Sequence, residues 1–352
     1  MQGRVDSPAA ADVFVGSGEM AARMRALDWS KTAVGPVENW PHSLKVTVRL
    51  MLSSRYAMWM GWGDDFTFFC NDAYLPTLGI KQEWALGTSA REVWAEIWTD
   101  IGPRAEAVLG TGIATWDEGL LLFLERRGFA EETYHTFSYS PVHNDAGDVG
   151  GMLCVVTEDT ERTIGERRLR SLRELAAATA SAKTVDEVCT RAASCLATAA
   201  RDLPFVLLFL RDEDSGRLRL AGQAGLQPGA ATARMTDDLA EGGWRFEEVQ
   251  AARVPVEMSD LGDRFGKVLA GPWPEPIRQA IVLPLHTSGQ DDRLAGFFVA
   301  GISTRRPLDE NYRGFLGLLA GQVTSALSDA RAYDEERKRA QRLAELDRAK
   351  TD

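Results

Sequence analysis

Residues 133–168 carry the pattern that most constrains the fold of this chain. Thr133–Val142 alternates, with aromatic side chains and a histidine on one side, as in a half-buried strand. Residues 143–147 form a turn cluster, and the apolar run Gly151–Val156 predicts the second strand of a hairpin. From Thr160 the sequence is charged and helix-forming. A small sheet is therefore expected to continue directly into an exposed helix, which would transmit a change in the sheet.

The preceding region has the pattern of a small aromatic-rich α+β domain. Strands are predicted at Tyr56–Trp62, Phe66–Cys70 and Gly119–Leu124, with helical segments between the second and the third. Asn71 and Asp72 are expected to cap the first of these helices, because either side chain can accept hydrogen bonds from the free amides of a first turn.

The second half of the chain predicts another α+β domain. Strands are expected at Phe205–Leu210, Arg217–Ala221, Ala280–Leu285 and Leu294–Ile302. Residues 226–271 are irregular and glycine-rich, and predict a loop or lid over the sheet. A final helix follows Asp309 and runs to the end of the chain.

Two helical segments carry apolar or small residues at spacings of three and four. These are Leu169, Leu172, Ala176 and Thr179 in the first, and Leu319, Val323, Ala326, Ala330, Tyr333, Arg337 and Ala340 in the second, where the stripe turns charged. Such stripes are typical of coiled-coil seams. They predict a parallel homodimer through residues 164–180 and 319–346, and the alternative is that each helix lies on its own domain.

Composition excludes several classes of function. The net charge of -11 is spread along the chain without a basic face, which argues against nucleic acid as a partner. No run approaches the ~18 apolar residues of a membrane span, and no signal-peptide core is present, so a cytoplasmic protein is predicted. The four histidines lack metal-ligand spacing, and no phosphate-binding loop occurs. No catalytic residue and no metal site are therefore predicted.

Four cysteines are present, and none of them forms a Cys-x-x-Cys motif. Buried, reduced thiols are the expected state. The alternative is a redox sensor acting through Cys70 or Cys154, which would require an exposed thiol of low pKa.

Several motifs together resemble the N-terminal PAS unit of bacterial sensor histidine kinases. They are Trp40-Pro41-x-Ser43-Leu44, Asn71-Asp72-Ala73-Tyr74, Thr136–Val142 with the Gly150-Gly151 pair, and the strand exit Glu158–Arg162. The layout of the second half, with Pro284 and Gly296, resembles a GAF domain. The segment Leu343–Thr351 is similar to the one that immediately precedes the phosphoacceptor helix of such kinases.

The resemblance implies an α+β chain of two domains, joined and followed by long signalling helices. The expected divisions are a disordered N-terminus 1–17, a helical cap 18–54, a PAS domain 55–160, a linker helix 161–183, a GAF domain 184–306 and an exit helix 307–352. The implied function is the input module of a two-component phosphorelay, with a response regulator as partner of the missing transmitter. The chain itself is then not an enzyme, although the full-length protein would be a protein histidine kinase. The alternative function is a dimerisation and protein-interaction module that binds no ligand.

Two sets of residues are candidates for the site. The residues expected to line a PAS cavity are Trp59, Cys70, Tyr74, Trp94, Trp98, Phe137 and Tyr139. Such a cavity suits a flat apolar or aromatic ligand, unless the same aromatics fill the space. No known cofactor's residues are recognised, so the cofactor is left unassigned. Asp159, Thr160 and Arg162 are expected to tie the last strand to the helix, and the alternative is an ordinary helix cap.

Overall fold

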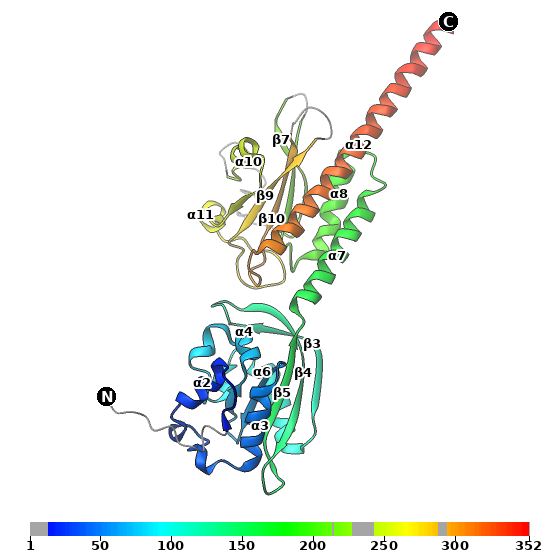
Figure 1. Ribbon diagram of the computed structural model, residues 1–352. Coiled ribbons are helices and arrows are strands. Elements are labelled where there is room, and N and C mark those ends of the chain that lie inside the picture. Colours follow the sequence, from blue (N-terminus) through cyan, green and yellow to red (C-terminus); the bar gives the residue numbers. More distant parts are fainter. Residues whose placement is uncertain (1–12, 213–214, 227–242, 288–293, 352) are drawn as a thin grey trace. The chain divides into compact units, whose positions relative to one another are not determined.

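The chain forms two α+β units, each built on a five-stranded antiparallel sheet. The computed structural model describes residues 13–212, 215–226, 243–287 and 294–351 (Figure 1). Unit 1 comprises Met1–Ile164 and unit 2 comprises Gly165–Asp352. The fold class predicted from the sequence is therefore present in both halves.

The sheet of unit 1 has the strand order β2-β1-β5-β4-β3. Its strands are β1 (Ala57–Trp62), β2 (Thr67–Cys70), β3 (Thr115–Leu124), β4 (Glu131–His143) and β5 (Val149–Glu158). The predicted hairpin is β4 and β5, which pair in antiparallel register with Phe137 opposite Val156.

Both faces of this sheet are covered near β2. The N-terminal elements are α2 (Glu19–Ala26), η1 (Trp29–Lys31), η2 (Val37–Asn39) and α3 (His42–Ser53). On their side Phe69 stacks on Trp29 at 4.9 Å between ring centroids. The preceding residue, Phe68, stacks on Trp59 at 5.4 Å. Because consecutive strand residues point to opposite faces, these two contacts place aromatic layers on both sides of the sheet.

The second group of unit 1 helices lies between β2 and β3 in the chain. It contains η3 (Asp72–Tyr74), α4 (Leu75–Leu78), η4 (Gly79–Glu83), α5 (Ala90–Val93) and α6 (Trp98–Thr111). Helix α6 packs on β3, β4 and β5. It begins after Ile97 and ends at Gly112, whose φ of 67° is the left-handed conformation that glycine adopts at low cost.

The expectation of a disordered N-terminus is wrong for its described part, while residues 1–12 lie outside the described residues. Val13 and Phe14 are buried, and Phe14 lies edge-on to Trp40 at 5.7 Å. A short apolar group inside a stretch of small residues is enough to anchor this segment, because the tryptophans of the cap offer it an apolar surface.

Helix α7 (Thr160–Thr179) follows β5 directly, as the sequence predicted. Its expected seam is only partly free. Leu169 is 48% exposed, but Thr179 is buried and Leu172 packs against the core of unit 2. The stripe therefore serves at least partly to pack the helix on its own unit.

The sheet of unit 2 has the order β7-β6-β10-β9-β8. Its strands are β6 (Val206–Arg211), β7 (Leu218–Ala224), β8 (Val256–Met258), β9 (Ala280–His286) and β10 (Leu294–Gly301). The central strands are buried on both faces, which explains why their sequences are apolar throughout instead of alternating.

One face of this sheet carries long helices and the other carries short ones. Helix α8 (Val185–Leu196), the turn η5 (Ala197–Ala199) and α12 (Glu310–Thr351) share a core with Val206, Leu208 and Leu210. On the other face the alternate residues of β6 pack with α10 (Phe246–Ala252) and α11 (Leu261–Phe265).

Two expectations for unit 2 are corrected. The described part of 226–271 is not a simple loop, because it contains α10, α11 and the fifth strand β8, while 227–242 lie outside the described residues. The first half of the exit-helix seam is buried within the unit, since Leu319, Val323 and Ala330 are each at most 1% exposed. These side chains fill the core of unit 2 and are not available to a second copy of the chain.

Candidate functional site

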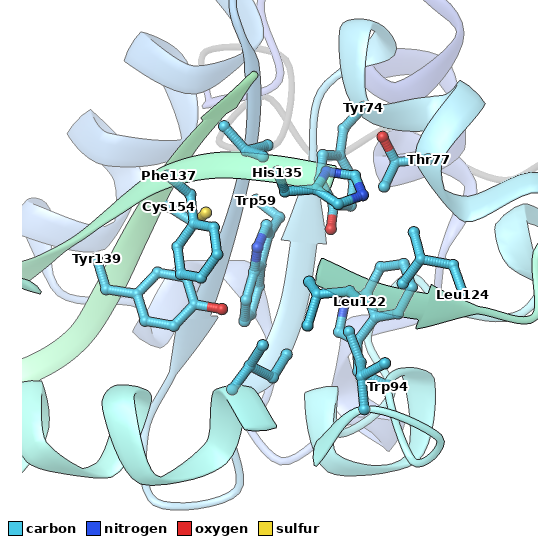
Figure 2. Close-up of a pocket in the computed structure, with 13 residues that line it drawn as sticks. Trp59, Tyr74, Thr77, Trp94, Leu122, Leu124, His135, Phe137, Tyr139 and Cys154 are labelled. Atoms are coloured by element: carbon cyan, nitrogen blue, oxygen red, sulfur yellow. The ribbon is translucent and has the colours of Figure 1, made fainter. Parts of the chain in front are cut away.

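A small cavity lies inside unit 1, between the sheet and the helices that follow β2 (Figure 2). Its volume is about 30 Å³. The lining residues are Trp59, Tyr74, Thr77, Trp94, Ile97, Ile101, Leu122, Leu124, His135, Phe137, Tyr139, Cys154 and Val156. The strands supply one wall and the helical segments supply the other.

Five of the seven residues predicted to line a cavity do so: Trp59, Tyr74, Trp94, Phe137 and Tyr139. Cys70 and Trp98 do not. Cys70 is buried at the end of a cross-strand row that includes Trp59 and Cys154, but it lies on the edge strand β2, beyond the cavity. Trp98 is half-buried and contacts the ring of Phe66 at 5.5 Å.

Three of the eight lining residues outside the predicted seven, Cys154, Val156 and His135, follow from the same strand alternation. Cys154 and Val156 alternate on β5 and lie opposite Tyr139 and Phe137. His135 lies on the same side of β4 as both of these aromatic residues. The strand alternation therefore contained the signal for these three, but it did not show that this face borders a cavity.

The polar side chains of the wall are electrically neutral near pH 7. Burial lowers the pKa of His135 to about 4, and Nε2 of its ring lies 3.1 Å from Oγ1 of Thr133. Burial also raises the pKa of the Tyr74 and Tyr139 hydroxyls well above the usual value, so both stay protonated. In Figure 2 these groups lie around the cavity.

The indole of Trp94 is held between the cavity and a buried ion pair. The ammonium of Lys81 lies 4.5 Å from the ring centroid, donates to the Val93 carbonyl at 2.7 Å and pairs with Glu96. The Nε1 atom of Trp94 is buried and has no hydrogen-bond partner within the described parts of the chain. A donor of this kind is uncommon in a protein interior.

Cys70 and Cys154 lack the exposed thiol of low pKa that a redox sensor would require. Cys70 and Cys154 are at most 1% exposed, and burial raises the pKa of both thiols. Burial also raises the pKa of Cys189 to about 12 and that of Cys195 above its usual value. A protonated, buried thiol is a poor nucleophile.

The predicted relay residues form a hydrogen-bonded junction between β4, β5 and α7. The amide of Asp159 donates to the carbonyl of Tyr134 at 2.8 Å, and the amide of Tyr134 donates to Oγ1 of Thr160 at 2.9 Å. The hydroxyl of Thr136 donates to the carboxylate of Asp159, and accepts from the amide of Gly119 on β3 at 2.9 Å. These hydrogen bonds connect the start of α7 to β4 directly, and to β3 through the Thr136 hydroxyl.

Two ion pairs lie at this junction, and the exposed one contributes less to its stability than the part-buried one. Arg162 contacts Asp159 at 3.2 Å but is 58% exposed, so this pair contributes little. The Thr136 hydrogen bond comes first among the causes that lower the pKa of Asp159. Arg126, from the β3–β4 turn, makes a bidentate pair with Glu158 at 2.7 Å for both contacts. Arg126 was not predicted, and nothing in its local sequence indicates this partner.

Within the described ranges, no group of three or more acidic, histidine or cysteine side chains is placed to hold a metal ion. In the same residues no helix has the length and apolar character needed to cross a membrane.

Comparisons with known proteins find structural similarity over about half of this chain. No protein-family model matches this chain, and no curated protein matches it. About half of the chain is similar to solved GAF domains. The GAF domain of an Acinetobacter phosphoenolpyruvate-protein phosphotransferase is 18% identical, with 47% of this chain and 95% of that chain covered and a TM-score of 0.35. A putative GAF sensor protein from Burkholderia vietnamiensis is 12% identical, with 47% and 96% covered and a TM-score of 0.32.

An enzyme is among the similar structures. The free methionine-R-sulfoxide reductase from Neisseria meningitidis, solved in complex with its substrate, is 23% identical, with 47% of this chain and 90% of that chain covered and a TM-score of 0.35. All three identities lie below 25%, so this likeness does not extend to activity.

Proposed function

We propose that this chain is the PAS–GAF input region of a sensor histidine kinase, in which an occupant of the unit 1 cavity changes how α7 is held. The observation that supports this function is the alternation of β4. His135, Phe137 and Tyr139 line the cavity, while Tyr134 and Thr136, between them, hold Asp159 and Thr160. A shift of β4 would therefore move both the cavity wall and the residues that hold the start of α7.

In this proposal the signal is a change in population between two arrangements of the helices. A ligand shifts such an equilibrium only by as much as its affinity differs between the two arrangements. Contact with the side chains of β4 supplies that difference, since the same strand holds the first turn of α7. Helix α12 then carries the change to a transmitter, which phosphorylates a response regulator.

The second candidate is a dimerisation and interaction module without a ligand. The small volume of the cavity, about 30 Å³, favours it, because the predicted aromatics fill most of the space. A redox sensor is a weaker candidate, because Cys70 and Cys154 are buried and their thiols are held protonated.

The test uses Asp159→Ala, with Asp64→Ala as the matched control at an exposed turn. Both are made in residues 1–352 fused in helical register to a histidine-kinase transmitter. We expect Asp159→Ala to change the autophosphorylation rate, while the lost helix-start contact costs only about 0.5–2 kcal/mol of stability. Asp64→Ala should behave as wild type. Equal rates in all three proteins, with unit 1 folded in each, would refute the proposal.

A further inference from the structure

The walls of the unit 1 cavity select a particular kind of occupant. We propose that this occupant is a compact, uncharged molecule that carries a hydrogen-bond acceptor. This inference rests on the proposed function, because it names the class of ligand to which unit 1 would respond. Three properties of the wall support it: its lack of charge, its unsatisfied donor and its size.

Among the residues that the structure describes, no charged side chain lines the cavity. Its polar groups are the hydroxyls of Tyr74, Thr77 and Tyr139, the His135 ring, the Trp94 indole and the Cys154 thiol. The nearby Lys81 and Glu96 already pair with each other, and Lys81 lies against the ring of Trp94. An ion in the cavity would lose its hydration without gaining a counter-charge, which is strongly unfavourable. Carboxylates, phosphates and ammonium compounds are therefore poor occupants.

The indole N–H of Trp94 requires an acceptor. The side chain is 1% exposed, and Nε1 is unpaired in the described residues although the indole lines the cavity. Indole nitrogen is a donor only, so the partner must carry a lone pair. Figure 2 shows this indole beside Leu122 and Leu124, among the side chains that line the cavity. A carbonyl or hydroxyl oxygen of a ligand placed there would satisfy the donor.

The volume limits the occupant to a few atoms. About 30 Å³ accommodates about two water-sized groups, whereas a benzene ring occupies a cavity of about 150 Å³. The flat aromatic ligand expected from the sequence is therefore too large for the cavity in this conformation. The remaining walls, including Ile97, Ile101 and Leu122, favour an occupant with an apolar side.

Formamide and formate are suitable probes, because they have the same number of non-hydrogen atoms and differ in charge. Xenon is the third probe, since it is apolar and accepts no hydrogen bond. The measurement is the ¹H–¹⁵N resonance of the Trp94 indole, assigned through Trp94→Phe. With three non-hydrogen atoms, dissociation constants near or above about 1 mM are expected, so formamide and formate are titrated to about 100 mM at constant ionic strength.

We expect formamide to shift the Trp94 resonance saturably and formate to leave it unchanged. Trp94→Phe should weaken formamide binding about five- to tenfold, followed through cavity methyl resonances, because one hydrogen bond is lost. Trp98→Phe is the matched control, since Trp98 lies outside the cavity, and it should bind as wild type. Val156→Ile narrows the cavity and should weaken formamide binding, and it replaces Trp94→Phe as the test if that variant does not fold.

Three outcomes would overturn the inference. They are equal binding of formate and formamide, binding of xenon without formamide, and exclusion of all three probes. The Asp159→Ala experiment does not depend on the probes, so the two proposals fail separately. Formamide binding together with an unchanged phosphorylation rate in Asp159→Ala would retain the ligand class and refute the proposed function.

Discussion

The structural roles of single residues in unit 1 depend on partners that are distant in the sequence. Asn71 and Asp72 were expected to cap a helix, but no such side-chain hydrogen bond forms. Instead Asn71 accepts from the amide of Met58 at 3.0 Å and donates to the carbonyl of Tyr56 at 2.7 Å. Asp72 accepts from the amide of Met20 on α2 at 2.6 Å. Local propensity identified polar residues with a structural role, but the tertiary contacts decided which role.

The buried His135 should make the stability of unit 1 depend on pH. Its pKa in the folded state is about 4, below the unfolded value of about 6.5. The folded state therefore binds fewer protons. The contribution of neutral, buried His135 to the free energy of unfolding is fully present above about pH 6.5 and is lost as the pH falls towards 4. Between pH 7 and about pH 5 we expect a loss of about 2 kcal/mol.

Urea unfolding followed by tryptophan fluorescence measures this effect, because eight of the ten tryptophans lie in unit 1. His135→Gln should remove about 2 kcal/mol of the difference between the two pH values. The exposed histidine at the end of β4 provides the control: His143→Gln should leave the difference as in wild type. The same pH dependence in His135→Gln and wild type would contradict the prediction.

At the scale of elements, one buried aspartate joins the two long helices of unit 2, through its carboxylate on one side and its main-chain carbonyl on the other. Asp202 is 0% exposed, and it pairs with Arg167 at 2.7 Å and with Arg168 at 3.2 Å, both on α7. Its carbonyl accepts from the hydroxyl of Tyr312 on α12, and the Arg168 guanidinium lies 4.2 Å from the Tyr312 ring. Helices α7 and α12 are thus connected around one aspartate, without involving the sheet.

Replacing this carboxylate should be costly. Asp202→Asn leaves the buried side of Arg168 without a counter-charge, and breaking a buried pair typically costs about 3–5 kcal/mol. The control is Asp186→Asn, since Asp186 is 64% exposed and pairs with an exposed Arg219, a contact worth at most about 1 kcal/mol. Chemical denaturation of unit 2, followed by far-ultraviolet circular dichroism, measures both. Equal effects of the two variants would show that Asp202 contributes no more than a surface ion pair.

At the scale of the whole molecule, α12 has two different halves. A stripe of its apolar residues up to Ala330 packs in the core of unit 2, whereas 335–346 are exposed, including Leu343 at 67% and Leu346 at 59%. A dimer seam on α12 must therefore use the later residues, since the earlier stripe is occupied. Leu169 on α7 and Leu318 on α12 are further exposed apolar side chains.

We predict a homodimer that depends on the exposed half of α12. The double substitution Leu343→Glu and Leu346→Glu should lower the dimer fraction without unfolding unit 2, because neither side chain is buried in it. Leu319→Ala is the complementary control, expected to cost about 2–5 kcal/mol of stability. It should not weaken association of the folded protein. Sedimentation velocity at micromolar concentration measures both, and a wild-type protein that is only monomeric would refute the dimer.

The sequence alone determined many of the elements of this protein, although not α10, β8 and α11, because periodicity and turn residues are local properties. The alternation of Thr133–Val142 predicted β4, and the charged run from Thr160 predicted α7 with its observed first residue.

The tertiary structure decided which segments pack against each face of these elements. Cys70 and Cys154 lie in one row facing the same way, yet only Cys154 reaches the cavity, because the strand residues that line it come from β1, β3, β4 and β5 and none comes from β2. The stripe Leu319–Ala330 has the same spacing as a dimer seam, but it packs within unit 2. Spacing specifies which side chains share a face, and only the packing of distant segments specifies the partner of that face.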